Sequence, residues 1–469
     1  MRVTVEGRPV SATSAHSNKI ELHVVVLRVR PLFSVALRCG AFRWSIGQVK
    51  LSLGRRALPF GFSIFDQVVL SLTNFLVGFV LIRYASDKDY ALFVLVQSAL
   101  QLLVTVHNSY LTGPVAILTP KLSDDERWQT IGSVKRVQRR LIRAAAVLLL
   151  PLPVLGYMAG IVDGLLAAVT EVGILAGWAA LRREYLRSVL LMYFRPHTLL
   201  AADAVYAGTL LAGVGIAIAI GKDVVVGAIL ALVSAGWLGA AAAHRSLAND
   251  PGWQEDRAVT IWPQIRALGF WSMLGSSIWW VLGQSYSFLL ASRLDLTAVA
   301  DVNATRLLLM PAIVLAIGVA SLLGPTAASW YAQIGIHRLV RRLLMFLLVV
   351  SAVEITYFVA VWVAQDWLAV DVLHKHIHDR NELLILWAGV ALVGTCRDIL
   401  QCALVALGRL KSLAWQVGVS SAVAVVLMWY GLGKWGAPGV LIGMIVGELI
   451  NLAGIILLLR SCMRKAVTP

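Results

Sequence analysis

The sequence has few charged residues and few cysteines. Charged side chains make up 14% of the 469 residues, whereas about 25% is usual in a soluble domain. Hydrophobic residues account for 59%, and the mean hydropathy is +0.79. These values exclude a soluble globular protein. The four cysteines are scattered, with no CxxC pair and no metal-ligand spacing, which excludes a disulfide framework and argues against redox chemistry.

Motifs for ATP-driven transport and for hydrolysis are missing. The chain contains no P-loop GxxxxGK[ST], no HExxH and no GxSxG. Energy for any transport must therefore come from a gradient or from the substrate itself, and we expect neither an enzyme nor a resident cofactor or metal. The net charge of +16 is typical of the basic cytoplasmic loops of a membrane protein, so no nucleic-acid partner is expected.

Long uncharged runs dominate the rest of the chain and predict an all-α integral membrane protein with about 12 transmembrane helices, since a spanning helix needs about 20 apolar residues. The fourth run carries four charged residues in its second half, which we interpret as interfacial anchors. The runs cover about 58–82, 90–119, 144–166, 168–193, 198–220, 224–243, 268–292, 298–323, 343–365, 383–408, 412–431 and 437–459.

The distribution of basic residues predicts the orientation of these spans. The loops after even-numbered spans, together with the C-terminal tail, hold 22 Lys and Arg, whereas the loops on the other side hold seven. Cytoplasmic loops carry the excess of positive charge, so both termini are expected in the cytoplasm. The longest outer segment, about 366–382, is too short for a catalytic domain.

The chain also shows a weak internal repeat. At an offset of 210 residues, Asp66 aligns with Ser276, Asn74 with Gln284, and the first two spans with the seventh and eighth. Two halves of six helices each would be parallel, related by an axis along the membrane normal. We therefore expect a basic N-terminal extension (mis-started or disordered), a first bundle, a cytoplasmic linker, a second bundle and a cytoplasmic tail. Their ranges are 1–56, 57–243, 244–267, 268–460 and 461–469.

Polar side chains in the first span gather on one face. Asp66, Gln67 and Asn74 lie with three Ser and Thr residues within an arc of about 160° at 100° per residue. Two interpretations remain open, a helix that lines a cavity and a polar seam between helices. Apolar residues on the opposite side would contact lipid.

Several charged residues lie near the middle of later spans, where a charge is costly and needs a cavity or a partner. Arg397 and Asp398 are adjacent and point about 100° apart, so each is expected to find its partner on another helix. Structural ion pairing is one interpretation, and a path for substrate and protons is the other. The embedded charged residues considered are Asp66, Asp203, Arg306, Glu354, Arg397, Asp398 and Glu448.

Three segments resemble the Wzx-type polysaccharide flippases of the multidrug, oligosaccharidyl-lipid and polysaccharide exporter superfamily. They are FDQVVLSLTNFLVGFVLIRY at 65–84, YALFVL at 90–95, and RREYLRSVLLMYFRP at 182–196 followed by AADAVY at 201–206. The resemblance implies two six-helix bundles around a central cavity in the bacterial inner membrane. It also implies a substrate of undecaprenyl-diphosphate-linked oligosaccharides for lipopolysaccharide or exopolysaccharide, with polymerase and export proteins as further partners besides membrane lipids.

A diphosphate needs cations, and arginine is suited to bidentate phosphate contacts, so Arg397 and Arg306 are the candidate phosphate ligands. Asn74 and Gln67 are candidates for contacts with the sugars. A carboxylate that gains and loses a proton could return the empty carrier, which makes Asp66, Glu354 and Glu448 the candidates for ion coupling. The alternatives are a proton- or sodium-coupled multidrug antiporter of the same fold and a membrane-embedded polysaccharide polymerase or ligase.

Overall fold

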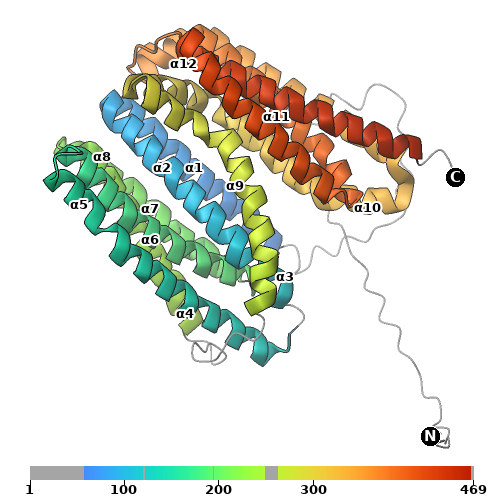
Figure 1. Cartoon of the computed structure of the whole chain (residues 1–469), viewed down its shortest axis with the longest axis horizontal. Helices are drawn as coiled ribbons and strands as arrows, with labels where there is room; N and C mark the ends of the chain where they lie inside the picture. Colours follow the sequence, from blue (N-terminus) through green and yellow to red (C-terminus); the bar gives the residue numbers. More distant parts are fainter. Residues whose placement is uncertain (1–57, 120–121, 194, 249–261, 466–469) are drawn as a thin grey trace, which may run out of the picture. The chain divides into compact units, whose positions relative to one another are not determined.

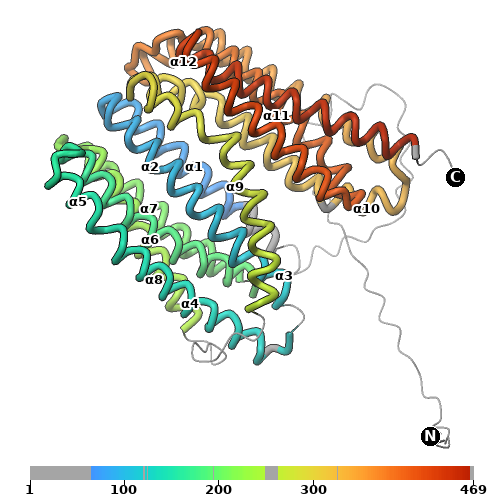
Figure 2. Tube along the Cα trace, in the orientation of Figure 1, coloured from blue at the N-terminus to red at the C-terminus, as the bar shows by residue number. Residues whose placement is uncertain are grey.

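The computed structural model describes residues 58–119, 122–193, 195–248 and 262–465, and these ranges contain helices and no strands (Figures 1 and 2). The predicted N-terminal extension, 1–56, lies outside the described residues. So does most of the predicted linker, since 249–261 are not described.

The first half of the chain forms six predicted spans, two of them built from consecutive helical segments. The second span runs from Asp87 to Leu118 and contains one turn of π-helix, and the third continues across Pro151 from α4 into α5. The segments are α1 (Leu58–Tyr84), α2 (Asp87–His107), η2 (Asn108–Thr112), α3 (Gly113–Leu118), α4 (Asp124–Leu149), α5 (Pro151–Met158), α6 (Gly164–Met192), α7 (Pro196–Ile220) and α8 (Val224–Ala248).

The second half contains two very long helices that each include a break. Gly335 has φ 74° and ψ 173° inside α10, and Gly436 has φ 61° and ψ −141° inside α12. Each break separates two predicted spans. The segments are α9 (Trp262–Arg293), α10 (Leu296–Val363), η4 (Trp367–Val372), α11 (Arg380–Ala406) and α12 (Leu410–Lys465).

Local sequence signals determine where several helices begin and end. The Asp163 side chain accepts a hydrogen bond from the Leu166 amide at the start of α6, which satisfies one of the free N–H groups of the first turn. Pro196 occupies the first turn of α7, where its missing N–H costs nothing, and Gly221 ends this helix in a left-handed conformation. The fourth and fifth predicted spans are therefore two helices, α6 and α7.

Ten described ranges are long and apolar enough to cross a membrane. The range Leu410–Arg464 counts once but contains the break at Gly436, so it corresponds to two predicted spans. These ranges therefore account for eleven predicted spans. The remaining predicted span lies in α9, which is less hydrophobic because it contains serine, glutamine and arginine. The chain is thus an all-α, multi-pass membrane protein. The third span differs from its prediction, because its helical part ends at Met158 instead of 166.

Buried apolar side chains connect the two halves. A large cluster in the described residues contains Tyr90 of α2, Tyr286 of α9 and Trp387 of α11. Two smaller clusters lie one in each half, around Tyr185 in the first and around Ile399 in the second. The halves therefore share a common core at one level and have separate cores elsewhere.

Candidate functional site

A cavity of about 230 Å³ lies between the two halves of the protein. Helices α1 and α2 contribute one wall, and α9 and α10 contribute the other. Asn74 and Gln284, which the repeat predicts to be equivalent, both line this cavity. Most of its polar lining consists of neutral amides. The polar lining residues are Asn74, Tyr90, Gln97, Ser98, Gln101, Gln284, Asn303 and Arg306.

Arg306 is the cation of this cavity. Its Nη1 donates to the Tyr286 hydroxyl at 3.0 Å and to Gln284 Oε1 at 3.4 Å. Its guanidinium also stacks on Trp387, 5.3 Å from the ring centroid. Within the described ranges no carboxylate pairs with Arg306, and its Nη2 and Nε form no hydrogen bond. The cavity therefore holds a positive charge without a counter-charge.

Aromatic residues fix the position of this guanidinium. The Tyr286 hydroxyl donates to Asn303 Oδ1 at 2.7 Å, and Trp387 Nε1 donates to the Val302 carbonyl at 2.9 Å. Tyr286 is fully buried and Trp387 nearly so. The donors of Arg306 are thus oriented before any ligand arrives, which reduces the cost of binding.

The halves also contact each other beyond the cavity, at the end predicted to face outward. Lys375, in the loop before α11, forms an ion pair with Asp87 at 2.5 Å and donates to the Ala85 carbonyl at 3.2 Å. Arg83 donates to the Val372 carbonyl at 2.7 Å. We call these contacts the outer latch. They connect residues nearly 300 positions apart, so they hold the two halves together.

A second set of contacts lies on the opposite side of the cavity. The Oγ atoms of Ser109 and Ser276 are 2.5 Å apart and share a hydrogen bond. Gly269 of α9 packs against the backbone of Tyr110 in the π-helical turn η2, leaving no room for a Cβ. These contacts form the inner layer. Along α2 and α9 the cavity lies between the outer latch and the inner layer.

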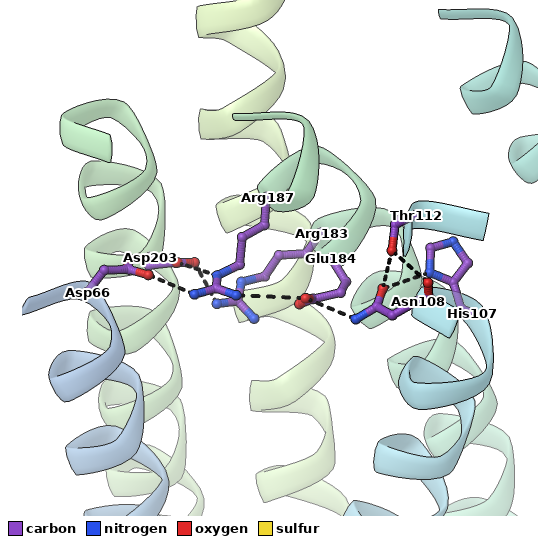
Figure 3. Close-up of polar contacts among 8 residues, drawn as sticks. All are labelled: Asp66, His107, Asn108, Thr112, Arg183, Glu184, Arg187 and Asp203. Atoms are coloured by element: carbon purple, nitrogen blue, oxygen red, sulfur yellow. Dashed lines mark hydrogen bonds and ion pairs between the residues drawn. The ribbon is translucent and has the colours of Figure 1, made fainter. Parts of the chain in front are cut away.

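The first half contains a buried network of charged side chains (Figure 3). Arg187 of α6 lies between Asp66 of α1 and Asp203 of α7, with Nη2 2.7 Å from Asp66 and Nε 2.8 Å from Asp203. Arg183 pairs with the same Asp203 at 2.5 Å. The side chains of Asp66 and Asp203 are 1% and 2% exposed. Three helices are therefore joined by charges that water scarcely reaches.

This network continues toward the inner layer. Glu184 lies 3.7 Å from Arg187 and accepts a hydrogen bond from Asn108 at 3.2 Å. Asn108 begins the π-helical turn η2 and contacts the neighbouring His107, whose Nε2 is 2.9 Å from Gln138 of α4 (Figure 3 shows the part from Asp66 to His107). π-Helical turns are often found at functional sites. Here the turn joins the charged network to the contact with α9.

The second half contains two separate buried acidic groups. Arg397 forms ion pairs with Glu448 of α12 and, at 3.0 Å, with its neighbour Asp398. The predicted partner of Arg397 on another helix is thus confirmed by Glu448. The prediction that Arg397 and Asp398 pair poorly is wrong, because the long arginine side chain turns back to reach the adjacent carboxylate. Glu354 is 0% exposed and accepts a hydrogen bond from Thr395 at 2.8 Å, with no basic partner among the described residues.

The structure brings only part of the predicted site together. Arg306 and Asn74 line the central cavity, whereas Gln67 is exposed two turns away on the same face of α1. Asp66, Glu354, Arg397 and Glu448 do not line it. They are buried within their own halves. The polar face of α1 thus combines both interpretations, with Asn74 lining a cavity and Asp66 in a polar seam.

Two arginines of the fourth predicted span do not have the predicted role. Arg183 and Arg187 are not interfacial anchors, because they turn inward and pair with Asp203 and Asp66. The first half has two embedded aspartates, and the basic residues of the fourth run could serve as their counter-charges, so this need was a signal that could have identified them.

The fold is similar to that of known transporters. An inward-facing multidrug resistance MATE family transporter of the MOP superfamily has a TM-score of 0.71 and 13% identity, covering 85% of this chain and 96% of that chain. The lipid II flippase MurJ, in an inward closed conformation, has a TM-score of 0.64 and 11% identity, covering 86% and 87%.

An outward-facing MATE family transporter has a TM-score of 0.59 and 13% identity, covering 88% and 95%. No family profile matches the sequence, and no curated protein sequence matches it significantly. The chain therefore has the fold of the MOP-superfamily transporters.

Proposed function

We propose that this protein is a flippase that moves undecaprenyl-diphosphate-linked oligosaccharides from the inner to the outer leaflet of the bacterial inner membrane. One observation carries the proposal. The cavity between the halves presents Arg306 among neutral amide side chains, and within the described segments this arginine has unused guanidinium donors and no counter-charge. A fixed cation is suited to a diphosphate, and amides are suited to sugar hydroxyls.

The size of the cavity indicates how such a substrate would be handled. About 230 Å³ is less than the roughly 300–1,000 Å³ of ordinary ligand pockets. An oligosaccharide therefore needs the inner layer or the outer latch to open. Opening one and then the other gives alternating access, while the lipid tail stays in the bilayer. The similarity to MurJ, described as a lipid II flippase, supports a lipid-linked substrate.

Charge counting supports ion coupling in each half. The first-half network has three carboxylates, Asp66, Glu184 and Asp203, but two guanidinium groups, Arg183 and Arg187. One proton would balance this set. Glu354 is buried and has no basic partner in the described part of the chain, and a charged carboxylate there would be costly. We propose that Asp66 and Glu354 exchange protons during the return of the empty carrier, with Glu448 held by Arg397.

The test is replacement of Arg306. In cells that depend on this protein, Arg306→Gln should reduce polysaccharide export at least tenfold and cause the lipid-linked precursor to accumulate inside, with normal amounts of protein in the membrane. Arg306→Lys should retain part of the activity, because lysine keeps the charge but loses the planar fork. A suitable control is Arg342→Gln, since Arg342 also stacks on a tryptophan, Trp330, but lies outside the cavity. Full export by Arg306→Gln would exclude the proposed phosphate contact.

The second candidate is a cation-coupled multidrug antiporter. The MATE similarity and the acidic excess in the first half favour it, since carboxylates can exchange a proton for a cationic drug. Deletion of the gene distinguishes the two functions. Intracellular accumulation of lipid-linked sugar identifies the flippase, and drug sensitivity without such accumulation identifies the antiporter.

The flippase proposal includes an orientation and partners. Both termini and the segment 244–267 would face the cytoplasm, with the bundles 57–243 and 268–460 in the membrane and the tail 461–469 inside. The protein would act as a carrier and not as an enzyme, so a polymerase and export proteins would process what it delivers. The short outer segment at about 366–382 argues against a polymerase or ligase, and detection of polymerisation by the purified protein would contradict this view.

A further inference from the structure

Helix α4 is amphipathic along its first five turns and is anchored to the first half by one face. Ile131 and Val134 are fully buried in the cluster around Tyr185. The Tyr185 hydroxyl donates to the Ile131 carbonyl at 2.5 Å, and Gln138 donates to the Leu181 carbonyl at 2.9 Å. The opposite face of this part of α4 is therefore held in a fixed position on the surface.

That opposite face is a row of arginines. Arg139, Arg140 and Arg143 are all exposed, and at 100° per residue they lie within an arc of about 100°. Arg140 and Arg143 form no ion pair with any described residue. No acidic residue occurs between Arg127 and Val162, so the helix itself offers no counter-charge. We call this row the arginine face of α4.

The arginine face continues directly into the lipid-facing part of the same helix. Val147 lies in the same arc, one turn after Arg143, and is 76% exposed. Leu148 beside it is 71% exposed. Since such apolar side chains need hydrocarbon around them, the arginines lie at the level of the lipid headgroups. A soluble acidic protein or a nucleic acid would have to compete there with the bilayer itself.

We propose that the arginine face of α4 binds the phosphate groups of anionic phospholipids in the leaflet predicted to face the cytoplasm. Basic residues next to a spanning segment attract anionic lipids, and arginine adds bidentate contacts with phosphate. This binding does not depend on which substrate the cavity carries. The buried face of the same helix contacts the charged network, because Gln138 lies 2.9 Å from His107. Bound lipid thus fixes the helix that contacts this network.

The test compares four forms of the purified full chain in nanodiscs of phosphatidylcholine with one-fifth phosphatidylglycerol. They are the unchanged protein, Arg140→Gln with Arg143→Gln, Arg140→Lys with Arg143→Lys, and the control Arg409→Gln with Lys411→Gln. The control removes two exposed charges at the start of α12, Arg409 just before the helix and Lys411 in its first turn. Native mass spectrometry after release from the nanodiscs counts phosphatidylglycerol and phosphatidylcholine bound to each form.

We expect the unchanged chain and the control to retain phosphatidylglycerol in preference to phosphatidylcholine. In the variant with two glutamines, the ratio of bound phosphatidylglycerol to phosphatidylcholine should fall about tenfold or more. In the variant with two lysines, which keeps the charge, this ratio should fall less. Thermal unfolding curves show that the variants are folded. Equal preference in the unchanged chain and the glutamine pair would overturn the proposal. So would loss of a co-purifying acidic protein with lipid retention unchanged, since the face would then be a protein interface.

Discussion

Three arginines inside the membrane part of this protein fall into two kinds, which the neighbours of each side chain determine. Arg187 lies between two aspartates, and Arg397 reaches Glu448 and Asp398, whereas Arg306 has only neutral partners among the described residues. The first two are neutralised inside their own half, so they stabilise a bundle. Arg306 keeps its charge, which the proposed function assigns to a phosphate contact. Sequence position alone does not distinguish these cases.

The ion pair of Arg397 allows a test of its role. Substrate binding by Arg397 stays a prediction, but its partners favour the alternative that it neutralises Glu448. Arg397→Ala should then lower the amount of folded protein, since breaking a buried pair costs about 3–5 kcal/mol. Adding Glu448→Gln in the same chain should restore folded protein and transport.

Quantitative immunoblots of membranes and the export assay measure both effects. If Arg397→Ala is instead well folded but inactive, and Glu448→Gln does not restore it, Arg397 contacts the substrate. Thr395→Val serves as a control for packing in the same helix, because it removes a hydroxyl bonded to Glu354 and no charge.

At the level of residues, the sequence identified the polar side chains within the spans, but it did not predict which of them contact one another. Arg306, Asn74 and Asp66 were identified because polar side chains are costly in a bilayer. The pairing of Asp66 with Arg187 was missed, because it depends on the rotation of α1 and α6 about their axes. Long arginine side chains add to this uncertainty, since Arg187 reaches inward from a position close to a helix end.

At the scale of elements, two glycines determine where the long helices of the second half break. Gly436 has φ 61° and ψ −141°, a conformation essentially confined to glycine. A Cβ at Gly436 would meet nothing within 4 Å, and the same holds for Gly433 one turn earlier. The two glycines thus differ in backbone conformation, whereas both have room for a Cβ. Alanine substitutions at the two positions therefore form a matched pair.

Gly436→Ala should destabilise the protein by about 1–3 kcal/mol, the cost of a strained backbone conformation. Gly433→Ala should be neutral or slightly stabilising, because alanine favours a helix over glycine. Thermal unfolding of both purified variants in detergent gives the comparison. Equal midpoints would show that the break at Gly436 does not constrain the fold.

The outer latch makes a second prediction at this scale. The Lys375–Asp87 pair is partly exposed, so it is worth about 0–1 kcal/mol and should influence opening more than stability. Asp87→Lys or Lys375→Asp should increase labelling of a cysteine at Asn74 by an impermeant maleimide added outside, by up to about fivefold. The double exchange should reverse the increase.

Lys88→Asp is the control, because Lys88 is exposed on the same turn and takes no part in the latch. If labelling increases as much in Lys88→Asp as in Asp87→Lys, then local charge, and not the contact between the halves, controls access to the cavity. Unchanged labelling in both single variants would mean that the latch does not hold the outer side closed.

Most elements were predictable because the hydrophobic effect and the bilayer thickness act on runs of residues. The breaks at Gly335 and Gly436 fall between predicted spans, and Pro196 begins α7 as expected. The length of α4 was not predicted, since its first five turns are amphipathic and too charged to count as a span. The π-helical turn η2 has no periodic signal in the sequence and was also missed.

At the scale of the whole molecule, the number of spans and the similarity to MOP-superfamily transporters agree with the fold predicted from hydropathy. The orientation stays a prediction. Reporter fusions at Ser246 and Arg460 should be active on the cytoplasmic side, and fusions at His376 and Lys434 should be external. An external result at Ser246 would contradict six spans in the first half. It would also contradict the parallel arrangement of the halves, which requires an even number of spans in each.

Arg306 also has a consequence for energetics across the membrane. A charge without a counter-charge in the low-dielectric middle of a bilayer feels the membrane potential, which is worth about 2.3 kcal/mol per 100 mV for a charge that crosses the whole field. With the cell interior negative, this charge in the empty, proposed flippase is drawn toward the cytoplasmic side. A bound diphosphate brings more negative charge than Arg306 neutralises, so it would reverse the direction of this pull. The electrical gradient would then assist the return step alongside the proposed proton exchange of Asp66 and Glu354.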